Sequence, residues 1–139
     1  MKVEVNNLTS FVISDKQISS ELNQIEKWYN QLTKKEKLSG FDLAVALVGK
    51  TRIKKANFQL RKKDQPTDVL SFCYEKKTGY REGELIICPE IIKKNAQSDR
   101  QPFEFEWRKN LIHGFLHIVG FEHSPEMFDL QAKILKKMK

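Results

Sequence analysis

The sequence has no apolar run close to the roughly 20 residues that cross a bilayer, and no charged start followed by an apolar segment of the signal-peptide kind. It therefore indicates neither a membrane span nor secretion, and we expect a cytoplasmic protein. Cysteine is scarce: Cys73 and Cys88 lie in separate strand-like segments, and we interpret both as reduced, small core residues. Repeats and low-complexity segments are also missing, so residues 1–139 are most simply one domain.

Acidic residues are outnumbered by basic ones. The chain has 25 lysines and arginines against 18 aspartates and glutamates, which gives a formal net charge of +7. A basic excess favours a polyanionic partner, because phosphate contacts release counterions and steer association. Lysines on solvated helix faces produce the same excess, so composition alone leaves nucleic-acid binding open.

Histidine is also scarce, and all three copies fall within HGFLHIVGFEH, at His113, His117 and His123. His113 and His117 are four residues apart and share one face of a helix. On a continued helix His123 would lie about 15 Å along the axis from His113. Ligands of one zinc ion must converge, so we expect the helix to stop at Gly120, where glycine adopts a left-handed conformation without a Cβ penalty.

The spacing of the histidines is that of metzincin proteases, with one chemical difference. Those enzymes have a glutamate general base after the first histidine, and this chain has Gly114. Three protein ligands leave a fourth position open, which is typical of catalytic zinc sites. We therefore predict a metal-assisted hydrolase other than a peptidase; the competing interpretation is that the histidines are packed core residues.

Hydrophobic periodicity predicts an α+β fold with the element order βαβαββααα. Strands are expected at 2–8, 41–48, 69–74 and 83–88, and helices at 15–32, from Thr51 to about 60, 89–96, 103–119 and 125–138. Ser14, Thr51 and Ser124 are the predicted N-caps of three of these helices. The third and fourth strands should pair as an antiparallel hairpin around Thr78–Gly79 within a mixed four-stranded sheet, and the metal-binding helix should have a zincin-like arrangement.

A second group of polar residues surrounds a proline turn: Arg61, Thr67, Asp68 and Ser71. The planar guanidinium of Arg61 can bind phosphate through two hydrogen bonds and stabilise the charge that develops in phosphoryl transfer. The alternative is an ordinary surface arginine beside a turn that is capped by Thr67 and Asp68.

The chain resembles the YbeY family of endoribonucleases. The likeness rests on PTDVLSF at 66–72, GELIICPE at 83–90 and HGFLHIVGFEH at 113–123, which is similar to the family's HGxLHLxGYDH. It implies a zinc-dependent endonuclease for single-stranded RNA that matures the 3′ end of 16S ribosomal RNA on the small ribosomal subunit and takes part in ribosome quality control. By position it implies that His113, His117 and His123 bind one zinc ion and that Arg61 is catalytic.

Two residues depart from the family pattern, and two other functions stay open. Glu122 stands where the family usually has aspartate, and Gln131 falls where an acidic residue is common. No general base is assigned; Glu122 is the nearest carboxylate in sequence, but next to an inward-pointing His123 we expect it to face away. The alternatives are a metal-dependent peptidase-like hydrolase and a non-catalytic, zinc-held adaptor that binds the ribosome.

Overall fold

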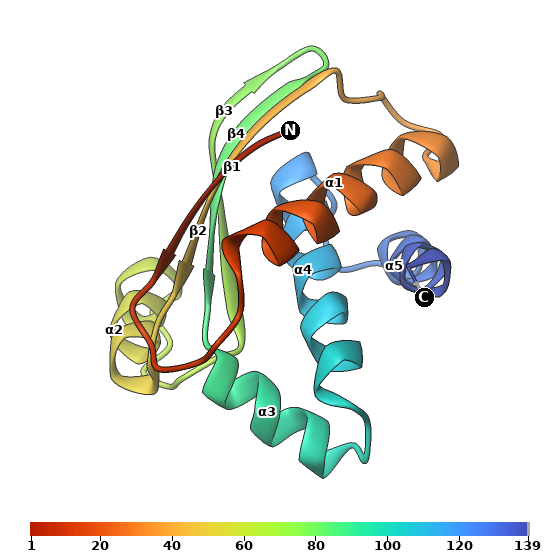
Figure 1. The fold of residues 1–139 in the computed structure, drawn as a ribbon. Helices are drawn as coiled ribbons and strands as arrows, with labels where there is room; N and C mark the ends of the chain where they lie inside the picture. The colour runs from red at the N-terminus through yellow and green to blue at the C-terminus, as the bar shows by residue number, and fades with distance from the viewer. Residues whose placement is uncertain (139) are drawn as a thin grey trace.

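The computed structural model describes residues 1–138, which form four strands and five helices in the predicted order (Figure 1). The elements are β1 (Lys2–Asn7), α1 (Asp15–Leu32), β2 (Gly40–Leu47), α2 (Lys50–Arg61), β3 (Val69–Lys77), β4 (Tyr80–Ile87), α3 (Pro89–Ser98), α4 (Phe103–Val119) and α5 (Pro125–Lys137). The α+β class and the predicted order of elements are therefore confirmed.

The sheet is mixed, as predicted, with the strand order β1-β2-β4-β3. β1, β2 and β4 run parallel, whereas β3 pairs antiparallel with β4. The hairpin turns at Gly79, whose φ of 73° is a conformation that glycine adopts readily. Both hairpin strands extend further toward the turn than expected. Their outer halves are polar and lack the apolar alternation on which the prediction depends.

Helices cover the two faces of the sheet unequally. Figure 1 shows α1 and α4 on one side of the sheet and α2 on the other, with α5 packed outside α1 and α4. Alternate residues of β2 and β4 are buried, and those that face α1 and α4 form the main core with residues such as Leu85 and Phe115. A smaller cluster around Ile53 and Leu70 holds α2 against the opposite face.

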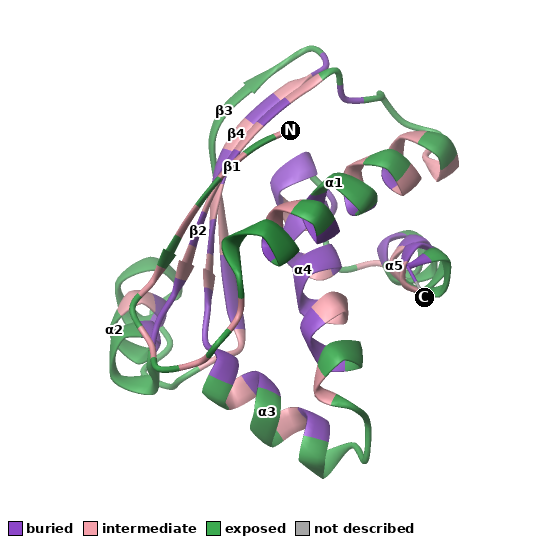
Figure 2. Ribbon diagram, in the orientation of Figure 1, coloured by how far each residue is buried: buried purple, intermediate pink, exposed green. Residues whose placement is uncertain are grey.

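The histidine-bearing helix α4 is firmly anchored. Ten of its 17 residues are buried, and Figure 2 shows buried segments along it. The buried carboxylate of Glu21 on α1 accepts hydrogen bonds from Trp107 Nε1 and Arg108 Nε, both at 3.0 Å. At its other end, α4 stops at Gly120, which has φ +124°, as the sequence predicted. The buried guanidinium of Arg81 donates to the carbonyl of Val119, which is close to the negative end of the helix dipole.

Two local predictions were wrong. Thr51 does not cap α2: the helix begins at Lys50 with Gly49 in the N-cap position, so that Ile53 and Asn57 face the sheet. Cys73 is exposed, because it lies next to the β-bulge between Cys73 and Glu75 on edge strand β3, whereas Cys88 is buried as expected. The predicted side-chain caps at Ser14 and Ser124 are confirmed.

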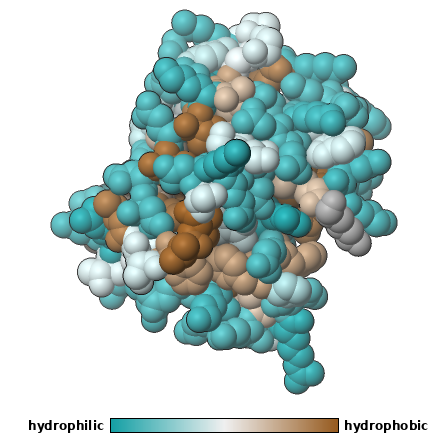
Figure 3. Space-filling view, viewed as in Figure 1, coloured by the Kyte–Doolittle hydropathy of each residue, from teal (hydrophilic) through white to brown (hydrophobic). Residues whose placement is uncertain are grey.

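Figure 3 shows one face on which hydrophilic side chains dominate and apolar side chains gather in separate patches. Within residues 1–138, none of the helices combines the length and the hydropathy that a membrane span requires.

Candidate metal centre

The three histidines come from α4 and from the short connection that follows it. His113 and His117 lie one turn apart on α4, and His123 lies immediately before Ser124, the N-cap of α5. Ser124 Oγ accepts a hydrogen bond from the backbone N–H of Met127 at 3.2 Å, which fixes the start of α5. The connection is thus held at both ends, by the turn at Gly120 and by the cap of α5.

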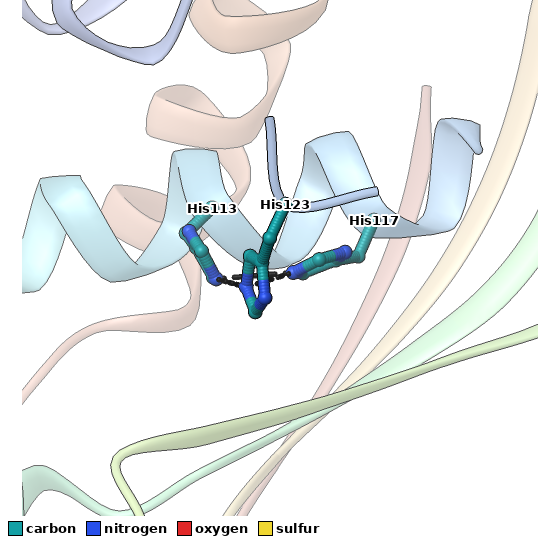
Figure 4. A group of neighbouring side chains, drawn as sticks. All are labelled: His113, His117 and His123. Atoms are coloured by element: carbon teal, nitrogen blue, oxygen red, sulfur yellow. Dashed lines mark hydrogen bonds between the residues drawn. The ribbon is translucent and has the colours of Figure 1, made fainter. Parts of the chain in front are cut away.

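The imidazoles converge on one point (Figure 4). The Nε2 atoms form a nearly equilateral triangle, with distances of 3.1 Å between His113 and His117, 3.0 Å between His117 and His123, and 3.2 Å between His123 and His113. Two nitrogens bound tetrahedrally to one zinc, each 2.0–2.1 Å from it, are separated by roughly 3.3 Å. The triangle therefore has the size that a shared metal ion requires.

Hydrogen bonds to the other ring nitrogens turn the Nε2 lone pairs toward this point. His117 Nδ1 donates to the carbonyl of Phe121 at 2.9 Å, and His113 Nδ1 donates to Gln131 Oε1 at 2.8 Å. In the neutral rings, the two Nε2 atoms then carry lone pairs that face each other. A cation between them would remove this repulsion, so the donor set fits a metal ion.

Burial keeps these two rings in the ligating form. Removal from water lowers the pKa of His113 and of His117 below the ordinary value for histidine, and mutual repulsion between the imidazoles lowers both pKa values further. Both rings are half-buried, whereas His123 is exposed. At neutral pH the two rings on α4 are therefore uncharged and available to a metal.

The histidines line one side of a cleft of about 610 Å³. Its opposite wall is made by the end of α2 and the start of β3, and includes Arg61, Thr67, Asp68 and Ser71. The tertiary structure thus brings together the two groups of polar residues that the sequence singled out. Within residues 1–138, no hydrogen bond or ion pair engages the Arg61 guanidinium, which leaves it available to an anion in the cleft.

A buried asparagine holds the chain segment that follows Arg61. Asn57 is 1% exposed, and its Nδ2 donates to the carbonyl of Gln65 at 2.9 Å. Lys62 ends α2 with φ 59°, a left-handed conformation that reverses the chain directly after Arg61. Asn57 therefore fixes the loop between α2 and the proline turn. The sequence gives no signal of this role, because a single asparagine inside a helix has no distinctive pattern.

Neither Gly114 nor Glu122 provides a general base in the cleft, which agrees with the sequence-based expectation. A Cβ atom on Gly114 would lie 2.6 Å from Leu85 Cδ2 and 3.3 Å from Val69 Cγ2, so the helix has no room there for the glutamate of a peptidase. Glu122 is exposed and does not line the cleft. Asp68 is the carboxylate that does line it; its Oδ1 accepts the backbone N–H of Val69 at 2.9 Å.

Fold and site together define an α+β protein with three histidines that can hold one metal ion beside an open cleft. Comparison with known proteins gives the family. The model of the family "Endoribonuclease YbeY" matches residues 6–139, and this chain belongs to that family.

Individual relatives agree with the family match. The Endoribonuclease YbeY of Thermotoga petrophila is 36% identical over 86% of this chain and 82% of its own length. That of Buchnera aphidicola is 33% identical over 99% of this chain and 88% of its own. A solution structure of a Thermotoga maritima protein is similar with a TM-score of 0.61 and 28% identity, over 97% of this chain and 87% of that one.

Proposed function

We propose that this protein is a single-strand-specific endoribonuclease that hydrolyses phosphodiester bonds with the help of one zinc ion. The observation that carries the proposal is the shared cleft, which is lined both by three convergent imidazoles and by Arg61. The family name of its relatives, Endoribonuclease YbeY, supports RNA as the substrate. The net charge of +7 supports a polyanionic partner as well.

His113, His117 and His123 would hold the ion in the zincin-like arrangement of a helix followed by a turn. Three imidazole nitrogens in a closely spaced triangle are a typical zinc donor set, and they leave a coordination position open. When bound, zinc supplies an acidified water and a Lewis acid for a phosphoryl oxygen.

Residues on the opposite wall act on the phosphate itself. The Arg61 guanidinium binds non-bridging oxygens and stabilises the negative charge that builds up on them during cleavage. The hydroxyls of Thr67 and Ser71 also line the cleft and can donate to the same oxygens. Asp68 is placed to accept a proton from a water molecule in the cleft, since its carboxylate lies on the same wall.

The biological setting follows from the family resemblance. We propose that residues 1–139 act as one domain in the cytoplasm, where the substrate is the 3′ end of 16S ribosomal RNA on the small ribosomal subunit, and that the same activity serves ribosome quality control.

Two variants test the proposal by separating metal binding from cleavage. His117→Ala should lose both zinc and the cleavage of single-stranded RNA, because it removes one donor of three. Arg61→Ala should retain zinc but lose roughly 10²- to 10³-fold in cleavage rate, the usual cost of removing one donor to a developing charge. Zinc content and RNA cleavage are measured on the same preparations.

Arg52→Ala is the matched control, because it removes an exposed arginine from the first turn of the same helix. It should cleave RNA at the wild-type rate. Wild-type cleavage by Arg61→Ala would remove Arg61 from the mechanism. Hydrolysis of casein but not of RNA by the zinc-loaded wild type would overturn the nuclease assignment in favour of a peptidase.

A further inference from the structure

One exposed aromatic side chain lies directly beside the candidate metal centre. Phe128, in the first turn of α5, is 48% exposed. Its ring is nearly parallel to that of His123, with an interplanar angle of 12° and 5.8 Å between centroids. It also lies 6.1 Å from the ring of His113. An apolar ring thus remains half in water, within the length of one nucleotide of the imidazoles.

The polar side chains of the cleft are suited to a phosphate, and the half-buried Phe72 on its wall is less open to a base than the exposed Phe128. Arg61, Thr67 and Ser71 supply a cation and two hydroxyls. A nucleobase needs a planar apolar partner, and stacking on an aromatic ring supplies much of the affinity of single-strand-binding proteins without reading the sequence. Phe128 does not line the cleft itself, but its exposed ring offers such a surface beside His113 and His123, which do line it.

We propose that Phe128 binds the nucleobase that flanks the scissile phosphate, by stacking that base on its exposed ring. The inference rests on the proposed endoribonuclease function and adds a base-binding subsite to it. It also gives a physical origin for single-strand preference. In a duplex both faces of a base are covered by neighbouring bases, so a base can reach Phe128 only after it has been unstacked.

A structural role for Phe128 is the competing explanation, and it predicts a different measurement. Two of the histidines have their Nδ1 atoms hydrogen-bonded, whereas His123 has no Nδ1 partner within the described residues. If the ring of Phe128 serves to orient His123, its removal weakens zinc binding. If it binds a base, its removal weakens RNA binding at saturating zinc.

The test is a coupling experiment between the side chain and a base. The proteins are zinc-loaded wild type, Phe128→Ala, Phe128→Tyr, which keeps the ring, and Phe105→Ala. Phe105 is the matched control, since it is 38% exposed in the first turn of α4 and lines a different groove. The probes are a short fluorescent single-stranded oligoribonucleotide and a series with one abasic residue at each position in turn. Stopped-flow anisotropy before the first turnover gives Kd, and chelator competition gives the zinc affinity.

An abasic residue at one position should weaken wild-type binding by about 5- to 150-fold. Phe128→Ala should bind the intact oligonucleotide more weakly by a similar factor and should lose nothing further at that position. Phe128→Tyr and Phe105→Ala should behave as wild type.

The proposal is overturned if every abasic penalty is the same in Phe128→Ala as in wild type. It is also overturned if Phe128→Ala loses zinc affinity but binds the intact oligonucleotide normally at saturating zinc. Failure of the proposed function is a separate result: wild type would then bind the oligonucleotide with the predicted coupling but would not cleave it.

Discussion

Gln131 gives the sharpest prediction about metal affinity, because it contacts a proposed ligand and departs from the family pattern. Its Oε1 accepts a hydrogen bond from His113 Nδ1 at 2.8 Å. A neutral hydrogen bond contributes about 0.5–1.5 kcal/mol, and one to a charged group about 1.5–3 kcal/mol. Gln131→Glu makes this bond charge-assisted. The gain should be only about 1 kcal/mol, because the site is half-buried and solvent screens part of the charge. Such a gain tightens zinc binding roughly fivefold.

Removing the acceptor should have the opposite effect. Gln131→Ala leaves the His113 ring without its partner, and loss of such a contact typically costs 10- to 100-fold in metal affinity. We expect a value near the lower limit, about tenfold, because water can reach the half-buried Nδ1. The assay is zinc competition against a chromophoric chelator at constant pH, with circular dichroism to verify the fold.

The control for the added charge is Ala132→Glu, which places a carboxylate on the next, exposed position of the same helix. It should change zinc affinity little. If Ala132→Glu and Gln131→Glu tighten binding equally, long-range attraction and not the hydrogen bond is responsible. Unchanged affinity in Gln131→Ala would refute a role for this contact altogether.

Two further predictions concern stability. Gly114→Ala should lower the free energy of unfolding by about 1–3 kcal/mol in urea titrations, because the new Cβ would lie 2.6 Å from the buried Leu85 Cδ2. The double variant Gly114→Ala, Leu85→Ala should lose less stability than the sum of the two single variants. Strict additivity would contradict the packing argument. The pKa values of the three tyrosines are raised above the ordinary 10: burial raises those of Tyr29 and Tyr80, and a hydrogen bond to the Glu84 carboxylate raises that of Tyr74 to about 12. Folding favours the protonated phenols, so their contribution to stability is complete below pH 10 and is lost as pH rises through their raised pKa values, which for Tyr74 means about 12. Ultraviolet titration of the folded protein should show less phenolate at pH 10 than the unfolded chain does, and Tyr74→Phe should remove the latest step. A tyrosine that ionises at its ordinary pKa in the folded state would disprove the assignment.

Local signals in the sequence predicted the elements well where side chains cap or end them. Ser14 marks the start of α1, Ser124 that of α5, and Gly120 the end of α4, because each satisfies a backbone requirement that depends on neighbouring residues. Prediction failed where the environment lies outside the local sequence. The outer half of β3 is polar because it lies at an exposed edge of the sheet. The N-cap of α2 is Gly49 and not Thr51, because the packing of the buried Ile53 determines where that helix begins.

The candidate site also has features that the sequence predicts and features that it does not. The three histidines were predictable because their spacing and an intervening glycine make convergence possible on a single stretch of chain. The contact of Gln131 with His113 and the support of the Arg61 loop by Asn57 were not predictable from periodicity. Both depend on side chains from separate segments that meet only in the folded chain.

The sequence by itself determined the donor set, the turn that lets it converge and the exclusion of a glutamate base at position 114. Only the tertiary structure decided what surrounds the donors. It packed α4 so closely against the sheet that a Cβ atom on Gly114 would clash with Leu85, and it brought the end of α2 to the cleft that the histidines line. The physical reason is the sequence separation over which each kind of interaction acts. Caps, turns and ligand spacing act over a few residues, whereas the position of Arg61 relative to His117 depends on how two helices are held on opposite faces of one sheet.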